Sequence, residues 1–104
     1  MNSRELDKRI EESKCLIVEF GTGSCSACRG IREKIEKKID ENSPFEFVYI
    51  SIDQYPEVAG ERGIFSGPTI EVYINGKMTL RKSGYFSLEE VFSDIKRYFE
   101  VMGE

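Results

Sequence analysis

The pattern of apolar and polar positions predicts four helices and four strands in the order α-β-α-β-α-β-β-α. The first helix, about residues 4–13, carries a short apolar stripe, and Ser3 is its predicted N-cap. The strand that follows, residues 16–20, is apolar on both faces except at Glu19. A strand of this kind is predicted to be buried within a sheet.

A second helix is predicted from the apolar residues that recur at every third or fourth position through residues 29–41, opposite a charged face. Cys25 and Cys28 are expected in its opening turn, and Asn42-Ser43-Pro44 is expected to end it. Residues 45–52 are rich in aromatic and β-branched side chains, which predicts a second buried strand.

The last part of the chain predicts a hairpin between two helices. A short helix is expected over residues 57–62, followed by strands at residues 69–74 and 77–83. Asn75-Gly76 between these strands is the dipeptide that a two-residue hairpin turn favours. In such a hairpin Glu71 lies diagonal to Lys82 on one face, so the two are expected to form an ion pair.

The final helix is predicted to begin with a capping box formed by Ser87 and Glu90. Tyr85-Phe86, just before it, is expected to pack into the core or to staple the helix start; the alternative is that these residues flank a binding groove. Because a helical crossover joins the first two strands, they should be parallel, whereas the hairpin is antiparallel. The sequence therefore predicts an α/β fold, a four-stranded mixed sheet with helices on both faces, as one domain over residues 1–104.

Composition narrows the possible functions. The chain has 15 basic and 19 acidic residues, a net charge of −4 and no basic block, which argues against a nucleic-acid partner. It has no long apolar run, and its start looks like a charged helix and not a signal peptide, so we expect a cytoplasmic protein without a membrane segment. The three cysteines are too few for a disulfide-stapled secreted fold.

Cys25-Ser26-Ala27-Cys28, at a strand-to-helix junction, carries the candidate chemistry. Two sulfurs at positions i and i+3 of a helix's first turn lie on one face, close enough to bond. The free N–H groups at the helix start favour a thiolate at Cys25. The spacing therefore predicts a reversible dithiol couple. A structural disulfide would be reduced in the cytoplasm, and a metal site would need two further ligands in a chain without histidine, which leaves only a metal shared by two chains.

Several landmarks in this order make the chain resemble the thioredoxin family. They are the strand at residues 16–20, the Cys25–Cys28 motif, Ile52-Asp53-Gln54-Tyr55-Pro56, Gly67-Pro68-Thr69, Asn75-Gly76-Lys77 and Gly84. The resemblance extends from about Ile10 to the C-terminus, with the family's usual first strand missing. It implies that Cys25 is the exposed nucleophile, Cys28 the buried resolving cysteine, and Pro68 a cis-proline beside them.

The resemblance also implies roles for Gly84, which would line the substrate groove, and for Glu19, which would be the buried acid that exchanges a proton with the resolving cysteine. Tyr49 stands where the family often has a lysine beside that acid. Without the lysine, Glu19 would be desolvated with no cationic partner, which should raise its pKa. Cys15 is expected to be a small buried hydrophobe.

Other departures surround the cysteines. Ser24 replaces the usual tryptophan, and Ser26-Ala27 replaces Gly-Pro, which should change how well the thiolate is stabilised; the Ser26 hydroxyl could also hydrogen-bond towards the sulfur. Gly67 replaces the β-branched residue common before the cis-proline, so the groove should be wider or less rigid there.

Taken together, the resemblance implies a monomeric protein-disulfide reductase that needs no metal and no organic cofactor. Its partners would be a client protein with a disulfide and a reductase or thiol pool that returns the electrons. Two alternatives stay open on the sequence: a binding module that makes little use of its cysteines, and a dimer bridged by a metal through the Cys-x-x-Cys motif.

Overall fold

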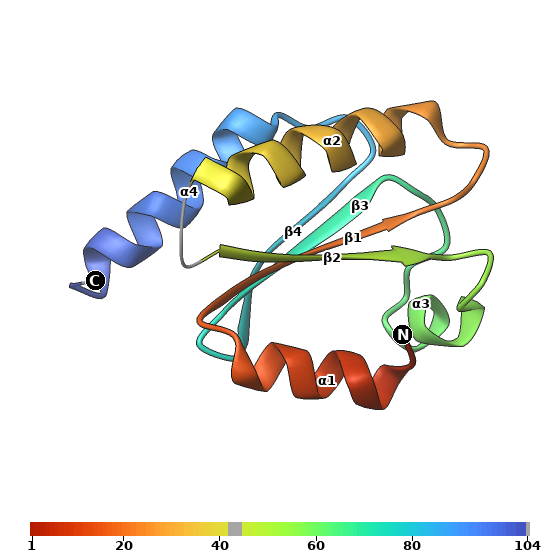
Figure 1. Ribbon diagram of the computed structural model, residues 1–104, viewed down its shortest axis with the longest axis horizontal. Coiled ribbons are helices and arrows are strands. Elements are labelled where there is room, and N and C mark those ends of the chain that lie inside the picture. Colours follow the sequence, from red (N-terminus) through yellow and green to blue (C-terminus); the bar gives the residue numbers. More distant parts are fainter. Residues whose placement is uncertain (42–44, 104) are drawn as a thin grey trace.

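The computed structural model describes residues 1–41 and 45–103 and has the predicted order of elements (Figure 1). The helices and strands are α1 Ser3–Glu12, β1 Cys15–Gly21, α2 Ser26–Glu41, β2 Phe45–Ser51, α3 Pro56–Glu61, β3 Thr69–Ile74, β4 Lys77–Ser83 and α4 Leu88–Val101. The predicted helix stop at Asn42-Ser43-Pro44 lies outside the described residues. Most predicted boundaries are correct within one residue, and α2 begins at Ser26, between the two cysteines.

The four strands form one mixed sheet in the order β2-β1-β3-β4. β1 is parallel to β2 and antiparallel to β3, and β3 and β4 form the antiparallel hairpin, as predicted. All seven residues of β1 are buried, because the strand has a neighbour on each side and helices over both faces. The prediction that the second strand is buried was wrong for most of its residues: β2 lies at an edge and is mainly half-buried.

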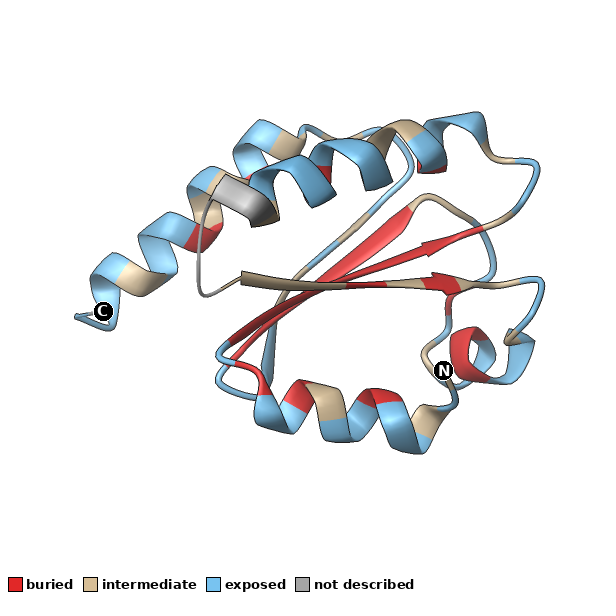
Figure 2. Cartoon of the chain, viewed as in Figure 1, coloured by how far each residue is buried: buried red, intermediate tan, exposed pale blue. Residues whose placement is uncertain are grey.

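Two helices cover each face of the sheet: α2 and α4 lie on one side, and α1 and α3 on the other (Figure 1). Successive side chains of a strand point to opposite faces. In β1, Leu16, Val18 and Phe20 therefore join the core under α1 and α3, whereas Cys15 and Ile17 join the core under α2. Figure 2 shows the buried residues along the strands and on the inner sides of the helices.

Cys15 is fully buried, as predicted. Burial raises the pKa of its thiol to about 12. A thiol in this state is unreactive near neutral pH, because the thiolate is the nucleophilic form.

The cap of α1 differs from the prediction by one residue. Asn2, not Ser3, is the N-cap: its side chain accepts a hydrogen bond from the Glu5 N–H at 2.8 Å, and the Glu5 carboxylate accepts one from the Asn2 N–H at 3.1 Å. Only this frame places a glutamate three residues after the cap, so it satisfies two N–H groups at once. The Ser3 hydroxyl instead donates to Glu61 on α3.

The hairpin turn is as predicted, with positive φ angles at Asn75 and Gly76, but the expected ion pair between Glu71 and Lys82 was wrong. A β-bulge beside Val72 shifts the register by one residue and places Arg81 opposite Glu71. Such an extra residue moves every later side chain of the strand to the other face. Glu71 therefore pairs with Arg81 instead.

Glu71 is fully buried on the α1–α3 side of the sheet and has three donors. Arg81 donates to its Oε2, and both Arg62, at 3.4 Å, and the Tyr73 hydroxyl, at 2.7 Å, donate to its Oε1. Arg62 also reaches Asp7 on α1 at 3.1 Å. This network satisfies the buried carboxylate and connects the hairpin to α1 and to the residue after α3.

Replacing Glu71 by glutamine should lower the free energy of unfolding by about 3 kcal/mol, because two arginines would lose their buried counter-charge. Glu46→Gln is the matched control, since it removes only a partly exposed ion pair with Arg9 and should cost less than about 1 kcal/mol. Urea denaturation of both variants at neutral pH measures the difference. Equal, small losses would contradict a structural role for the Glu71 network.

Candidate functional site

The two sulfurs of the Cys-x-x-Cys motif lie where β1 passes into α2. β1 ends at Gly21, and the Cys25 N–H donates to the Thr22 carbonyl at 3.2 Å, which closes the connecting turn. Cys25 and Cys28 form a disulfide with their Cα atoms 5.3 Å apart. The fold therefore brings these two thiols together, as the spacing predicts.

Cys25 sits at the N-cap position of α2, because the helix begins at the next residue. The N–H of Cys28, the third residue of the helix, donates to Cys25 Sγ at 3.1 Å. This is the contact that a serine or aspartate oxygen makes at other helix starts. A negative charge on this sulfur would be stabilised by the N–H and by the positive end of the helix dipole.

The two sulfurs differ in accessibility. Cys25 is half-buried and lines a cleft of about 690 Å³, whereas the Cys28 side chain is only 1% exposed. A partner molecule can therefore reach Cys25, whereas Cys28 is shielded from contact.

The cleft beside Cys25 collects most of the residues that the sequence singled out. Its lining includes Ser24, Cys25, Ser26, Ala27, Gly67, Pro68 and Gly84. The Gly67–Pro68 peptide bond is cis, as the resemblance implied, and the Gly84 N–H donates to the Pro68 carbonyl at 3.1 Å. This hydrogen bond brings Gly84 to the wall of the cleft, although it lies sixteen residues further along the chain.

Sequence reasoning missed part of the lining, which also contains Ile31 and Lys34 of α2. Tyr85, for which a place beside the groove was the alternative prediction, lines it as well. The spacing of three from Cys25 and Cys28 to Ile31 and Lys34 was a usable signal, because such residues share one helix face. Tyr85 is fully exposed, so the expectation that it packs into the core was wrong. Phe86 does pack against the core as expected, and its other side also lines the cleft.

Ser26 is exposed, and within residues 1–41 and 45–103 its hydroxyl makes no hydrogen bond to Cys25 Sγ. The Ser24 hydroxyl instead pairs with that of Thr22 at 3.3 Å. That Ser24, Ser26 and Ala27 tune the redox couple stays a prediction.

Glu19 lies on β1, two residues before Gly21, on the side of the strand that faces α2. It is fully buried, and neither carboxylate oxygen has a hydrogen-bond partner in the described part of the chain. Burial raises its pKa to about 8; the guanidinium of Arg32 lowers the pKa in part, and the carboxylate of Glu36 raises it. The predicted rise of this pKa is confirmed, with Arg32 as a cation nearby that the sequence had not indicated.

Tyr49 is the register partner of Glu19 on β2, so the two side chains share one face of the sheet. A Cβ atom at Gly21 would lie 2.6 Å from the Tyr49 hydroxyl and 2.9 Å from Cys28 Sγ. The hydroxyl and the inner sulfur therefore both border the space above Gly21 that the Cβ of any other residue would fill. The guanidinium of Arg32 stacks over the Tyr49 ring, 4.5 Å from its centre, and fixes the ring from the α2 side.

That Gly67 makes the groove wider or less rigid stays a prediction, but the position of this glycine has a further consequence. A Cβ atom there would lie 2.9 Å from Cys28 Sγ and 2.9 Å from the Gly21 Cα. The missing side chain thus lets the cis-proline turn pack directly on the inner sulfur and on the end of β1. The glycine therefore allows these backbones to approach each other closely.

Two further findings concern other classes of site. Among the described residues, no group of three or more histidine, cysteine, aspartate or glutamate side chains is arranged to hold a metal ion. No helix in the described chain is both long enough and apolar enough to cross a membrane.

Comparisons with a family model, with related sequences and with solved structures all indicate the same family. The thioredoxin family model matches residues 1–97. Thioredoxin of Mycoplasmoides gallisepticum is 28% identical over 86% of this chain and 90% of the relative, and that of Mycoplasma genitalium is 30% identical over 79% and 80%. The solved structure of oxidised thioredoxin from Plasmodium falciparum superposes with a TM-score of 0.77 at 26% identity, covering 88% of this chain and 90% of that one. The chain therefore belongs to the thioredoxin family and is a thiol–disulfide oxidoreductase.

Proposed function

We propose that this protein reduces disulfide bonds in client proteins, with Cys25 as the nucleophile and Cys28 as the resolving cysteine. The observation that carries the proposal is the asymmetry of the two sulfurs. One is accessible and accepts an N–H at the start of α2, and the other is buried within bonding distance of it. A reductant needs this arrangement, because its first sulfur must meet the client and its second must release it.

In the first step the Cys25 thiolate attacks one sulfur of a client disulfide. A bond forms between that sulfur and Cys25, and the other client sulfur leaves as a thiolate. In the second step Cys28, as a thiolate, attacks Cys25 Sγ and displaces the remaining client sulfur. The client gains two electrons, the Cys25–Cys28 disulfide forms, and a reductase or thiol pool must then return the electrons.

Cys28 has to lose a proton before the second step, and Glu19 is the acceptor in this proposal. The raised pKa of Glu19, about 8, makes its carboxylate a stronger base than an ordinary carboxylate, which favours the uptake of a proton from a thiol. Because neither oxygen has a hydrogen-bond partner among residues 1–41 and 45–103, both are available to accept the proton. The Tyr49 hydroxyl, beside Cys28 Sγ and on the face of Glu19, offers a route for the proton.

The cleft positions the client in the first step. Gly67, Pro68 and Gly84 form its wall beside Cys25 and leave backbone, not bulky side chains, to face an extended client segment. Ser24, Ser26 and Ala27 surround the outer sulfur and set how strongly the helix start stabilises its thiolate. The steps need no metal and no organic cofactor, because the electrons pass only between sulfur atoms.

Cys25→Ser should abolish insulin reduction with dithiothreitol as the electron source, because the attacking sulfur is gone. Cys28→Ser should instead accumulate a mixed disulfide with the client, detectable on a non-reducing gel. Cys15→Ala is the control with unchanged activity, since this third thiol is buried and unreactive. Full activity of Cys25→Ser would exclude the proposal. Capture of a client by a variant that lacks both cysteines would favour a binding module. Zinc or iron bound at half the chain concentration would favour a metal-bridged dimer.

Glu19→Gln should slow the second step, in which Cys28 releases the client from its mixed disulfide with Cys25, by on the order of 100-fold, because the proton acceptor is removed. The parent's release rate should rise as the pH passes about 8, where Glu19 becomes a carboxylate, and the variant should lack this rise. Rapid-mixing kinetics of client release across pH measures both. Tyr49→Phe shows whether the proton passes through the hydroxyl.

Glu19→Gln should also change how the free energy of unfolding depends on pH. Glu19 ionises at about 4.5 when unfolded and at about 8 when folded, so it destabilises the folded state increasingly between these pH values. Relative to Glu19→Gln, the free energy of unfolding of the oxidised parent should fall by on the order of 4 kcal/mol between pH 4.5 and pH 8, as measured by urea denaturation. A constant difference across this window would mean that Glu19 is not buried with a raised pKa.

A further inference from the structure

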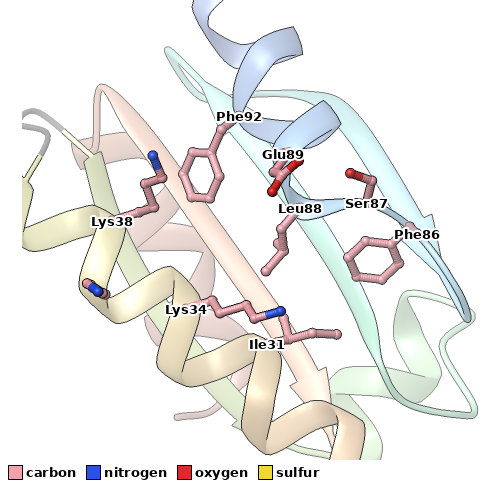
Figure 3. Close-up of a pocket in the computed structure, with 9 residues that line it drawn as sticks. Ile31, Lys34, Lys38, Phe86, Ser87, Leu88, Glu89 and Phe92 are labelled. Atoms are coloured by element: carbon pink, nitrogen blue, oxygen red, sulfur yellow. The ribbon is translucent and has the colours of Figure 1, made fainter.

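A second cleft continues from the cleft beside Cys25 along the surface between α2 and α4 (Figure 3). Its volume is about 710 Å³. Ile31, Lys34 and Phe86 line both clefts, so the two are continuous and a chain bound at Cys25 can pass directly into the second. None of the roles proposed for the reaction uses this second cleft.

The floor of this α2–α4 cleft is apolar. Ile31 of α2, Phe86 before α4, and Leu88 and Phe92 of α4 point into it, and each is only partly buried (Figure 3). These four side chains pack on the core with one side and leave the other side facing solvent. Covering them with apolar side chains of a partner would be favourable in proportion to the area removed from water.

The charges around the cleft are mostly positive. Lys34, Lys37 and Lys38 line it from α2, and Glu89 is the one acidic residue among those that line it. Lys38 lies 5.9 Å from the centre of the Phe92 ring, and neither Lys34 nor Lys37 forms an ion pair with a side chain that the structure describes. The chain as a whole has a net charge of −4, so this local excess of positive charge is a property of the cleft and not of the composition.

We propose that the α2–α4 cleft binds the client segment next to the reacting cysteine, and that it selects segments with acidic and apolar residues. This proposal rests on the reduction of client disulfides by Cys25. We assign the occupant to the client because the α2–α4 cleft is continuous with the cleft that contains Cys25, so a client bound to Cys25 can extend into it. The segment is acidic because Lys34 and Lys37 already outnumber the single carboxylate of Glu89, and it is apolar in part because the floor of the cleft is apolar.

The dimensions limit the length of this segment. Ile31 and Lys38 are seven residues apart on α2, a rise of about 10 Å along the helix. An extended chain covers this distance with about three residues. We therefore expect recognition of roughly three to four residues on one side of the client cysteine.

The test compares peptide disulfides that differ only beyond the cysteine. Each carries a fluorophore pair that separates on reduction, and a four-residue extension that is acidic and apolar (Asp-Leu-Glu-Leu), neutral (Gln-Leu-Gln-Leu), or acidic without leucine (Asp-Ser-Glu-Ser), placed before or after the cysteine. The reduced protein should reduce the acidic apolar peptide on the order of tenfold faster than the other two at low salt, with the extension on one side only. The advantage should shrink at about 0.3 M salt.

Two variants with the same change in net charge locate the effect. Lys37→Glu, at a lysine that lines the α2–α4 cleft and not the cleft beside Cys25, should weaken the preference for the acidic peptide, whereas Lys77→Glu, at the start of β4, should keep it. A peptide without extension should react equally with the parent and both variants, which shows that the reduction itself is intact. Equal rates for all extensions in the parent, or equal losses in both variants, would overturn the proposal while leaving the reductase function in place.

Discussion

The pairing of β1 on both of its edges is the constraint on which the site depends. β2 binds it on one side and β3 on the other, and all seven of its residues are buried. The end of this strand is therefore held in place, and the short turn after Gly21 leads directly into α2. Cys25 reaches the N-cap of that helix with little freedom, so its sulfur meets the Cys28 N–H without further ordering of the chain.

Two fully buried glutamates show how the same residue type serves different purposes on the two faces of one sheet. Glu71 has three donors around its carboxylate, and the network ties the hairpin to α1. Glu19 has none in the described chain, and its pKa is raised to about 8. A buried carboxylate without partners costs stability, and such a group is retained where its proton is needed. The contrast supports a role for Glu19 in the chemistry and for Glu71 in the fold.

Glycines and one tyrosine shape the surroundings of the inner sulfur. Gly21 and Gly67 leave room for Cys28 and the cis-proline turn to pack closely, and the Tyr49 hydroxyl occupies the remaining space above Gly21. Arg32 holds the tyrosine ring through its guanidinium. Backbone and one phenol thus pack around the inner sulfur, and the Cys28 side chain is only 1% exposed.

The sequence by itself determined the elements, their order and the identity of the reacting sulfurs, because these depend on local periodicity, turn residues and spacing. It also pointed to Glu19, since an acid in an otherwise apolar strand is conspicuous. Only the tertiary structure decided that a bulge pairs Glu71 with Arg81, that Tyr85 is exposed, and that α2 and α4 form a basic cleft. These features arise from registers and contacts between distant segments, and no local pattern of residues encodes which side chains will meet there.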